Sequence, residues 1–115
     1  RRQSDRAIGE FQLVQAMLAD CKVEIEAARA LVVDTARRRD DGQDVTMQAS
    51  MCKYFASEVA GRVADRAVQI FGGAGYCEDI GGAVPRLYRD VRLFRLYEGT
   101  SQVHQLNIAK HLLRD

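Results

Sequence analysis

Residues 10–39 contain neither glycine nor proline, the two residues that most readily interrupt a helix. Apolar or small side chains recur there at spacings of three and four positions, as on one face of a helix: Phe11, Val14, Leu18, Cys21, Ile25, Ala28, Val32 and Ala36. A helix over this stretch would span roughly 45 Å. Gly42 supplies a C-terminal stop. The sequence therefore predicts one long amphipathic helix, which is unusual for a small globular domain.

A second long helix is predicted over residues 46–71, and the glycine-rich GGAGY at residues 72–76 ends it. Asp44 or Thr46 can cap its N-terminus. Its inward face is expected to carry larger apolar side chains interleaved with alanines: Met51 or Cys52, Phe55, Val59, Val63, Ala67 and Ile70.

Two shorter helices are predicted after a loop at residues 77–83. Pro85 suits the first turn of one helix, with Leu87, Val91 and Phe94 pointing inward. The last helix covers residues 100–113, and its expected buried positions are Val103, Leu106 or Asn107, Ile108 or Ala109, and Leu112. No stretch alternates with a period of two, so no strand is predicted.

These elements predict an all-α fold, most simply a four-helix up-and-down bundle with two long and two shorter helices. A length of 115 residues suits one domain, residues 1–115. The long pair exceeds its partners in length, so it either protrudes or packs on something outside this chain. The chain opens with RRQSD and no methionine, and we expect it to be a piece of a longer protein.

Composition excludes several function classes. Seventeen basic and sixteen acidic residues nearly cancel, so net charge gives no argument for nucleic acid or a charged membrane surface. No apolar run approaches the 18 residues of a membrane span. Three separated cysteines without a CxxC pair, and only two histidines, argue against a metal site. We expect the cysteines to be buried free thiols in a reducing compartment.

Local features alone leave the candidate sites open. The GGAG of residues 72–75 follows a helix, so it is first a helix stop, although its glycines would let a ligand approach the backbone. The arginines at 86, 89, 92 and 95 suggest a solvated or ion-paired face. His104 and His111 are interpreted as surface or packing residues. Glu98 could be a helix cap, one half of an ion pair, or a base.

Several stretches taken together resemble the C-terminal helical domain of the FAD-dependent acyl-CoA dehydrogenases. They are FQLVQAMLAD (11–20), EIEAARAL (24–31), QIFGGAGY (69–76), RLYRDVR (86–92) and LYEGTSQ (96–102), in the order and near the spacing of that family. The resemblance implies that a helical domain and a β-domain precede this bundle. It also implies α,β-dehydrogenation of an acyl-CoA thioester, with FAD as hydride acceptor.

The resemblance assigns roles residue by residue. Glu98 would be the base that removes the α-proton, while Tyr97 would line the substrate cavity and Gly99 would give close access to the thioester. FAD contacts would come from Thr100, Ser101 and Gln102. Contacts to the FAD of a neighbouring subunit would come from Gln69, Ile70, Phe71, Gly72, Gly73, Arg1 and Gln12. The family usually has Phe-Gly where this chain has Ser4-Asp5, and the loop CEDIGGAV is about two residues longer than is common.

Partners follow from the same resemblance: an acyl-CoA, an electron-transfer flavoprotein or similar acceptor, and further copies in a homodimer or homotetramer. The location it implies is the bacterial cytoplasm or, in a eukaryote, the mitochondrial matrix. We expect this chain alone to be inactive. Two alternatives stay open, namely a non-catalytic oligomerisation module derived from the family and an acyl-CoA oxidase-type relative.

Overall fold

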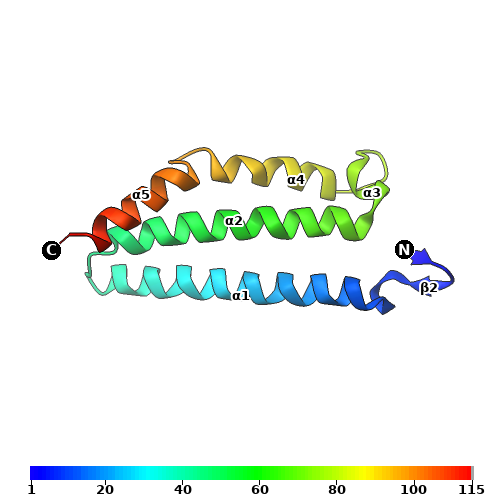
Figure 1. The fold of residues 1–115 in the computed structure, drawn as a ribbon, viewed down its shortest axis with the longest axis horizontal. Coiled ribbons are helices and arrows are strands. Elements are labelled where there is room, and N and C mark those ends of the chain that lie inside the picture. Colours follow the sequence, from blue (N-terminus) through cyan, green and yellow to red (C-terminus); the bar gives the residue numbers. More distant parts are fainter. Residues whose placement is uncertain (115) are drawn as a thin grey trace.

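The computed structural model describes residues 1–114 and is mainly helical (Figure 1). Its principal helices are α1 (Gln12–Asp40), α2 (Thr46–Phe71), α4 (Val84–Arg92) and α5 (Ser101–Leu112). A single-turn helix, α3 (Gly73–Tyr76), follows α2, and short 3-10 turns η1 (Ile8–Glu10) and η2 (Leu93–Arg95) precede α1 and follow α4. The all-α prediction, with two long and two shorter helices, is confirmed.

Helix α2 is the centre of the molecule. It runs antiparallel to α1 on one side, while α4 and α5 follow one another along another side (Figure 1). The result is an elongated body of 60 × 25 × 24 Å. Because α2 has neighbours on two sides, most of its side chains are at least half-buried and Val59 is its most enclosed apolar residue, 3% exposed.

A small hairpin at the N-terminus was not predicted. Strands β1 (Arg2–Gln3) and β2 (Arg6–Ala7) pair antiparallel. The turn between them is Ser4-Asp5, and both residues have positive φ, 49° and 60°, as tight two-residue hairpin turns require. Strands of two residues are too short to show a period of two, and Ser-Asp lacks the glycine that usually marks such a turn.

The face of α1 that packs on α2 is narrower than the predicted stripe. Its innermost positions are seven residues apart, with Val14, Ala28 and Thr35 buried and Cys21 half-buried. Four of the eight positions in the predicted stripe are exposed within this chain: Leu18, Ile25, Val32 and Ala36. The prediction was wrong there because α1 carries two apolar lines, and only one of them meets a neighbour along residues 1–114.

Several predicted core positions of the shorter helices are also exposed. In α5 the inward residues are Ser101, His104, Ile108 and Ala109, while Val103, Leu106, Asn107 and Leu112 face outward. In α4, Val91 is half-buried but Leu87 is exposed, and Phe94 of η2 is exposed as well. A helix of nine to twelve residues with apolar side chains on several sides does not by itself show which side packs.

The cysteines differ from the expectation at one position. Cys21 and Cys52 are half-buried free thiols, and the Cys52 Sγ–H donates to Thr35 Oγ1 at 3.2 Å. Cys77 is exposed, because it lies just after α3 in the loop before α4. Among residues 1–114, no group of three or more His, Cys, Asp or Glu side chains could hold a metal. In the same stretch, no helix is long and apolar enough to cross a membrane.

An ionic contact joins the two long helices midway. The Glu24 carboxylate of α1 accepts from Arg66 at 3.1 Å and from Arg62 at 3.0 Å, both on α2. The Glu24 and Arg66 side chains are only 23% and 22% exposed. The hydrogen bond from Arg66, followed by the contact with Arg62, holds the pKa of Glu24 below its ordinary value.

Replacing Glu24 with glutamine is expected to lower the free energy of unfolding of the full-length protein by about 1 kcal/mol at neutral pH. Because the folded pKa is lowered, this stabilisation is present above the unfolded pKa of about 4.3 and is lost as pH falls through the folded pKa. Urea denaturation at pH 7 and in acid should show the difference between the two proteins closing in acid. The exposed Glu26→Gln variant is the control and should change stability less, and a difference that is independent of pH would contradict the assignment.

Candidate functional site

Glu98 lies in a tight turn between η2 and α5. Its φ is 54° and that of the following Gly99 is 89°. Glycine enters this left-handed region freely, but a glutamate there costs roughly 1–2 kcal/mol. Strained non-glycine residues are concentrated at functional sites, so the backbone marks Glu98 as a candidate.

Side chains from two helices hold this turn. Lys53 of α2 donates from Nζ to the Gly99 carbonyl oxygen at 2.6 Å, and His104 Nε2 lies 3.1 Å from the Glu98 carbonyl oxygen. Thr100 caps α5, since its hydroxyl accepts from the Val103 N–H at 3.3 Å. The Thr100 hydroxyl is thus the N-cap of α5, and the Glu98 carboxylate is not.

Glu58 of α2 ties both flanks of the turn to the helix. One of its carboxylate oxygens accepts from the Ser101 hydroxyl at 2.6 Å, and the other lies 3.5 Å from Arg95 Nη1. Gly61 makes room for Arg95, because a Cβ at this position would lie 3.2 Å from the guanidinium carbon. The segment from Arg95 to Ser101 is therefore anchored on each side of Glu98.

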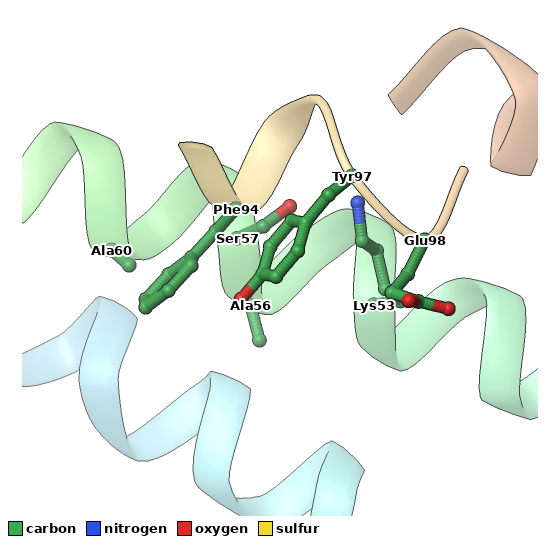
Figure 2. A pocket seen from close by; sticks show the side chains of 7 residues that line it. All are labelled: Lys53, Ala56, Ser57, Ala60, Phe94, Tyr97 and Glu98. Atoms are coloured by element: carbon green, nitrogen blue, oxygen red, sulfur yellow. The ribbon is translucent and has the colours of Figure 1, made fainter. Parts of the chain in front are cut away.

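A hollow of about 410 Å³ opens beside the turn (Figure 2). Its walls are mostly apolar, with Lys53, Ala56, Ser57 and Ala60 of α2 facing Phe94, Tyr97 and Glu98. The rings of Phe94 and Tyr97 stack with centroids 5.9 Å apart. Within residues 1–114 the Glu98 carboxylate has neither an ion-pair nor a hydrogen-bond partner, so no side chain of the described residues holds it in place.

Three of the four arginines before the turn, all but Arg92, have the partners that a paired face predicts. Arg86 pairs with Asp90 at 3.9 Å, Arg89 with Glu78, and Arg95 with Glu58. Within residues 1–114, no arginine pairs with the Glu98 carboxylate.

The residues expected to contact FAD fall into two groups. Thr100, Ser101 and Gln102 lie at the start of α5, next to Glu98. The Ser101 hydroxyl is buried and bonded to Glu58, so this residue could meet a ligand only through its backbone. The first N–H groups of a helix have no partner within it and attract anions or polar ring atoms, and the first turn of α5 has no acidic residue to compete.

The second group lies at the far end of α2. Gln69, Ile70 and Phe71 close that helix, Gly72 has φ 64°, and Gly73 has open space around it. A Cβ at position 72 would collide with the Arg1 guanidinium, so Arg1 does meet this glycine, and the exposed Gln12 begins α1. An open backbone beside a cation suits a phosphate group.

These two groups are far apart. The nineteen residues of α2 from Lys53 to Phe71, just before Gly72, correspond to about 28 Å of helix. One chain therefore does not gather all of the candidate residues around one cofactor, although each group by itself fits part of one.

The model of the family described as acyl-CoA dehydrogenase, C-terminal domain, matches residues 1–113. The chain belongs to the acyl-CoA dehydrogenase family. The chain is 43% identical over 114 residues to the CarC subunit of the caffeyl-CoA reductase-Etf complex of Acetobacterium woodii, covering 99% of this chain and 30% of that protein.

Solved structures carry the same fold. Butyryl-CoA dehydrogenase from Megasphaera elsdenii matches with a TM-score of 0.94 and 42% identity, over 99% of this chain and 29% of that one. An FAD complex of PigA matches with a TM-score of 0.90 and 31% identity, over 97% and 29% of the two chains. The chain thus spans about 30% of the length of these relatives.

Sequence reasoning missed three residues of this site. Lys53 and Glu58 contact the turn from positions more than forty residues away, and no local pattern signals such a contact. His104 was interpreted as a surface or packing residue, although it is half-buried beside Glu98. Its position six residues after Glu98, inside the first turns of the helix, was the available signal.

Replacing Glu98 with glycine is expected to stabilise the full-length protein by about 1 kcal/mol. Relief of the left-handed backbone is worth roughly 1–2 kcal/mol, and the extra chain entropy of glycine takes back about 0.5–1 kcal/mol. Glu98→Ala is the control, because it removes the carboxylate and keeps the strain. Thermal unfolding should rank glycine above alanine, and equal stability of the two variants would show that the turn is not strained.

Proposed function

We propose that the full-length protein catalyses FAD-dependent α,β-dehydrogenation of an acyl-CoA thioester, with Glu98 as the base. The observation that carries this is Glu98 beside an apolar hollow, with a strained backbone and a carboxylate that has no partner within residues 1–114. A carboxylate at the edge of an apolar cavity suits removal of a weakly acidic proton next to an apolar chain. Membership of the acyl-CoA dehydrogenase family supports the same reaction.

Each residue of this chain near the hollow would have its own role in the reaction. Glu98 takes the proton from the α-carbon, and the stacked rings of Tyr97 and Phe94 form a wall for the acyl chain. Lys53 keeps the Gly99 carbonyl engaged, so the turn stays open toward the thioester. FAD bound at this site would supply the hydride acceptor for the β-hydrogen, so that loss of one proton and one hydride would leave a carbon–carbon double bond.

The two separated groups of candidate residues support assembly from copies of the chain. Thr100, Ser101 and Gln102 would meet one FAD through the start of α5, and the group around Gly72 would meet the FAD of a neighbouring subunit. We propose a homodimer or homotetramer on this ground. Ser4 and Asp5 form the turn of the N-terminal hairpin, so the acid at position 5 would lie at a hairpin tip, near the second group.

The proposed reaction needs an acceptor for its electrons. One relative is a subunit of a complex with Etf, which supports an electron-transfer flavoprotein or similar acceptor as partner. The same relative is a reductase, and the reverse reaction uses the same groups, with Glu98 returning the proton. The proposed location remains the bacterial cytoplasm or the mitochondrial matrix.

The function is tested on the purified full-length protein. We expect flavin absorbance in proportion to subunits and turnover of an acyl-CoA when an artificial electron acceptor is added. Residues 1–115 alone, supplied with FAD, should show no turnover, because they contain only part of the site. A colourless oligomer would favour the oligomerisation module, and hydrogen peroxide formed without an added acceptor would favour an oxidase.

A further inference from the structure

We propose that His104 is a positioning residue that holds the Glu98 peptide in its left-handed conformation and so fixes where the Glu98 carboxylate lies. This inference rests on the proposed role of Glu98 as the base. It gives a mechanical role to a side chain that the sequence pattern left as a surface or packing residue.

The contact between the two residues defines the proton on the ring. His104 Nε2 lies 3.1 Å from the Glu98 carbonyl oxygen, and a carbonyl oxygen can only accept, so Nε2 must carry the hydrogen. Nδ1 is buried and has no partner among residues 1–114, so the Glu98 carbonyl is the hydrogen-bond partner of this ring within the described residues. The ring is therefore a donor aimed at the peptide that follows Glu98.

Packing brings the same ring against Gly99. A Cβ at position 99 would lie 3.0 Å from Nε2, and the φ of Gly99 is 89°. Both facts favour glycine there, which gives a structural reason for the Glu-Gly pair besides access to a thioester. The ring itself is carried by α5, where the His104 N–H bonds the Thr100 carbonyl at 3.1 Å. A donor on a regular helix holds its target more accurately than one on a loop.

Two successive carbonyl oxygens of the turn thus receive donors from different helices. His104 of α5 donates to the Glu98 carbonyl, and Lys53 of α2 donates to the Gly99 carbonyl. A glutamate stays in the left-handed region only when its surroundings hold it there. Loss of the His104 donor should let the peptide relax and move the carboxylate, and misplacement of a reacting group by about 1 Å can cost 100-fold in rate.

Three variants of the full-length protein separate positioning from packing. His104→Gln places an amide N–H near the position of the imidazole Nε2, whereas His104→Asn places one near Nδ1, too short to reach. His104→Leu fills the space without a donor. Each is measured for kcat, KM for acyl-CoA and flavin content, with Glu98→Gln in the same series, and wild type and His104→Leu are also crystallised.

We expect His104→Leu and His104→Asn to lose roughly 10- to 100-fold in kcat at unchanged KM and flavin content, and His104→Gln to recover most of it. In the crystal, Glu98 of His104→Leu should have left positive φ. Wild-type kcat in His104→Leu, equal losses in all three variants, or an unmoved Glu98 would each overturn the proposal. If Glu98→Gln retains activity, Glu98 is not the base. The conformation of Glu98 in the crystals still tests the role of His104 independently of that result.

Discussion

Glu98→Gln in the full-length protein is expected to reduce acyl-CoA turnover by about 1,000-fold, the scale of general base catalysis. Glutamine has nearly the shape of glutamate but cannot accept the α-proton. No ion pair or hydrogen bond of the Glu98 carboxylate within residues 1–114 is lost with it. Folding, flavin content and oligomeric state should therefore stay unchanged. Steady-state kinetics with an acyl-CoA measure the loss of turnover, and flavin absorbance of the same sample measures whether the flavin content is unchanged.

Two variants bracket that result. Glu98→Asp keeps a carboxylate but shortens the side chain, so it should fall between wild type and glutamine. Glu78→Gln removes an exposed carboxylate that pairs with Arg89 in the α3–α4 region, and it should leave turnover unaffected. Full turnover in Glu98→Gln would remove this residue from the role of base, whatever the family membership suggests.

Gly81→Ala is expected to destabilise the domain by about 3 kcal/mol, at the upper end of overpacking costs. Gly81 is buried where the loop after α3 turns into α4. A Cβ there would collide with the Ala74 carbonyl oxygen, lie 2.6 Å from the Cys77 carbonyl oxygen and 2.8 Å from Pro85 Cδ. Backbone atoms cannot swing aside, so the loop itself would have to move. Thermal unfolding of the full-length protein measures the effect.

The neighbouring Gly82 provides a matched control. It is exposed, and a Cβ there meets nothing within 4 Å, although its φ is 59°. Gly82→Ala should therefore cost only the backbone strain, about 1 kcal/mol. If the two alanine variants unfold alike, close packing around Gly81 is not what fixes this loop.

The helices were predictable because the signals for each helix lie within its own stretch of sequence. A glycine-free stretch with apolar spacing of three and four defines α1, and α2 ends at Gly72 as its glycines predict. Thr100 caps α5 through its hydroxyl, as a threonine before an apolar helix should. These features depend on residues that are close together in the chain, so the sequence alone is enough to predict them.

What a helix packs against could not be predicted in the same way. Leu18 and Ile25 looked as inward as Val14, and only the position of α2 decides between them. The site shows the same limit. Glu98 was found through a family resemblance, whereas Lys53 and Glu58 act on its turn from a helix more than forty residues earlier. Contacts of that kind belong to the fold and have no local signature.

Proton exchange at the α-carbon tests the central claim most directly, because it isolates the step assigned to Glu98. The substrate is an acyl-CoA analogue with sulfur in place of the β-carbon, which has no β-hydrogen to lose as hydride. The full-length protein and its Glu98→Gln variant are incubated with it in deuterium oxide, and deuterium uptake is followed by mass spectrometry. We predict rapid uptake with wild type and none above the uncatalysed rate with Glu98→Gln at equal flavin content. Equal uptake with both proteins would contradict the assignment of Glu98 as the base.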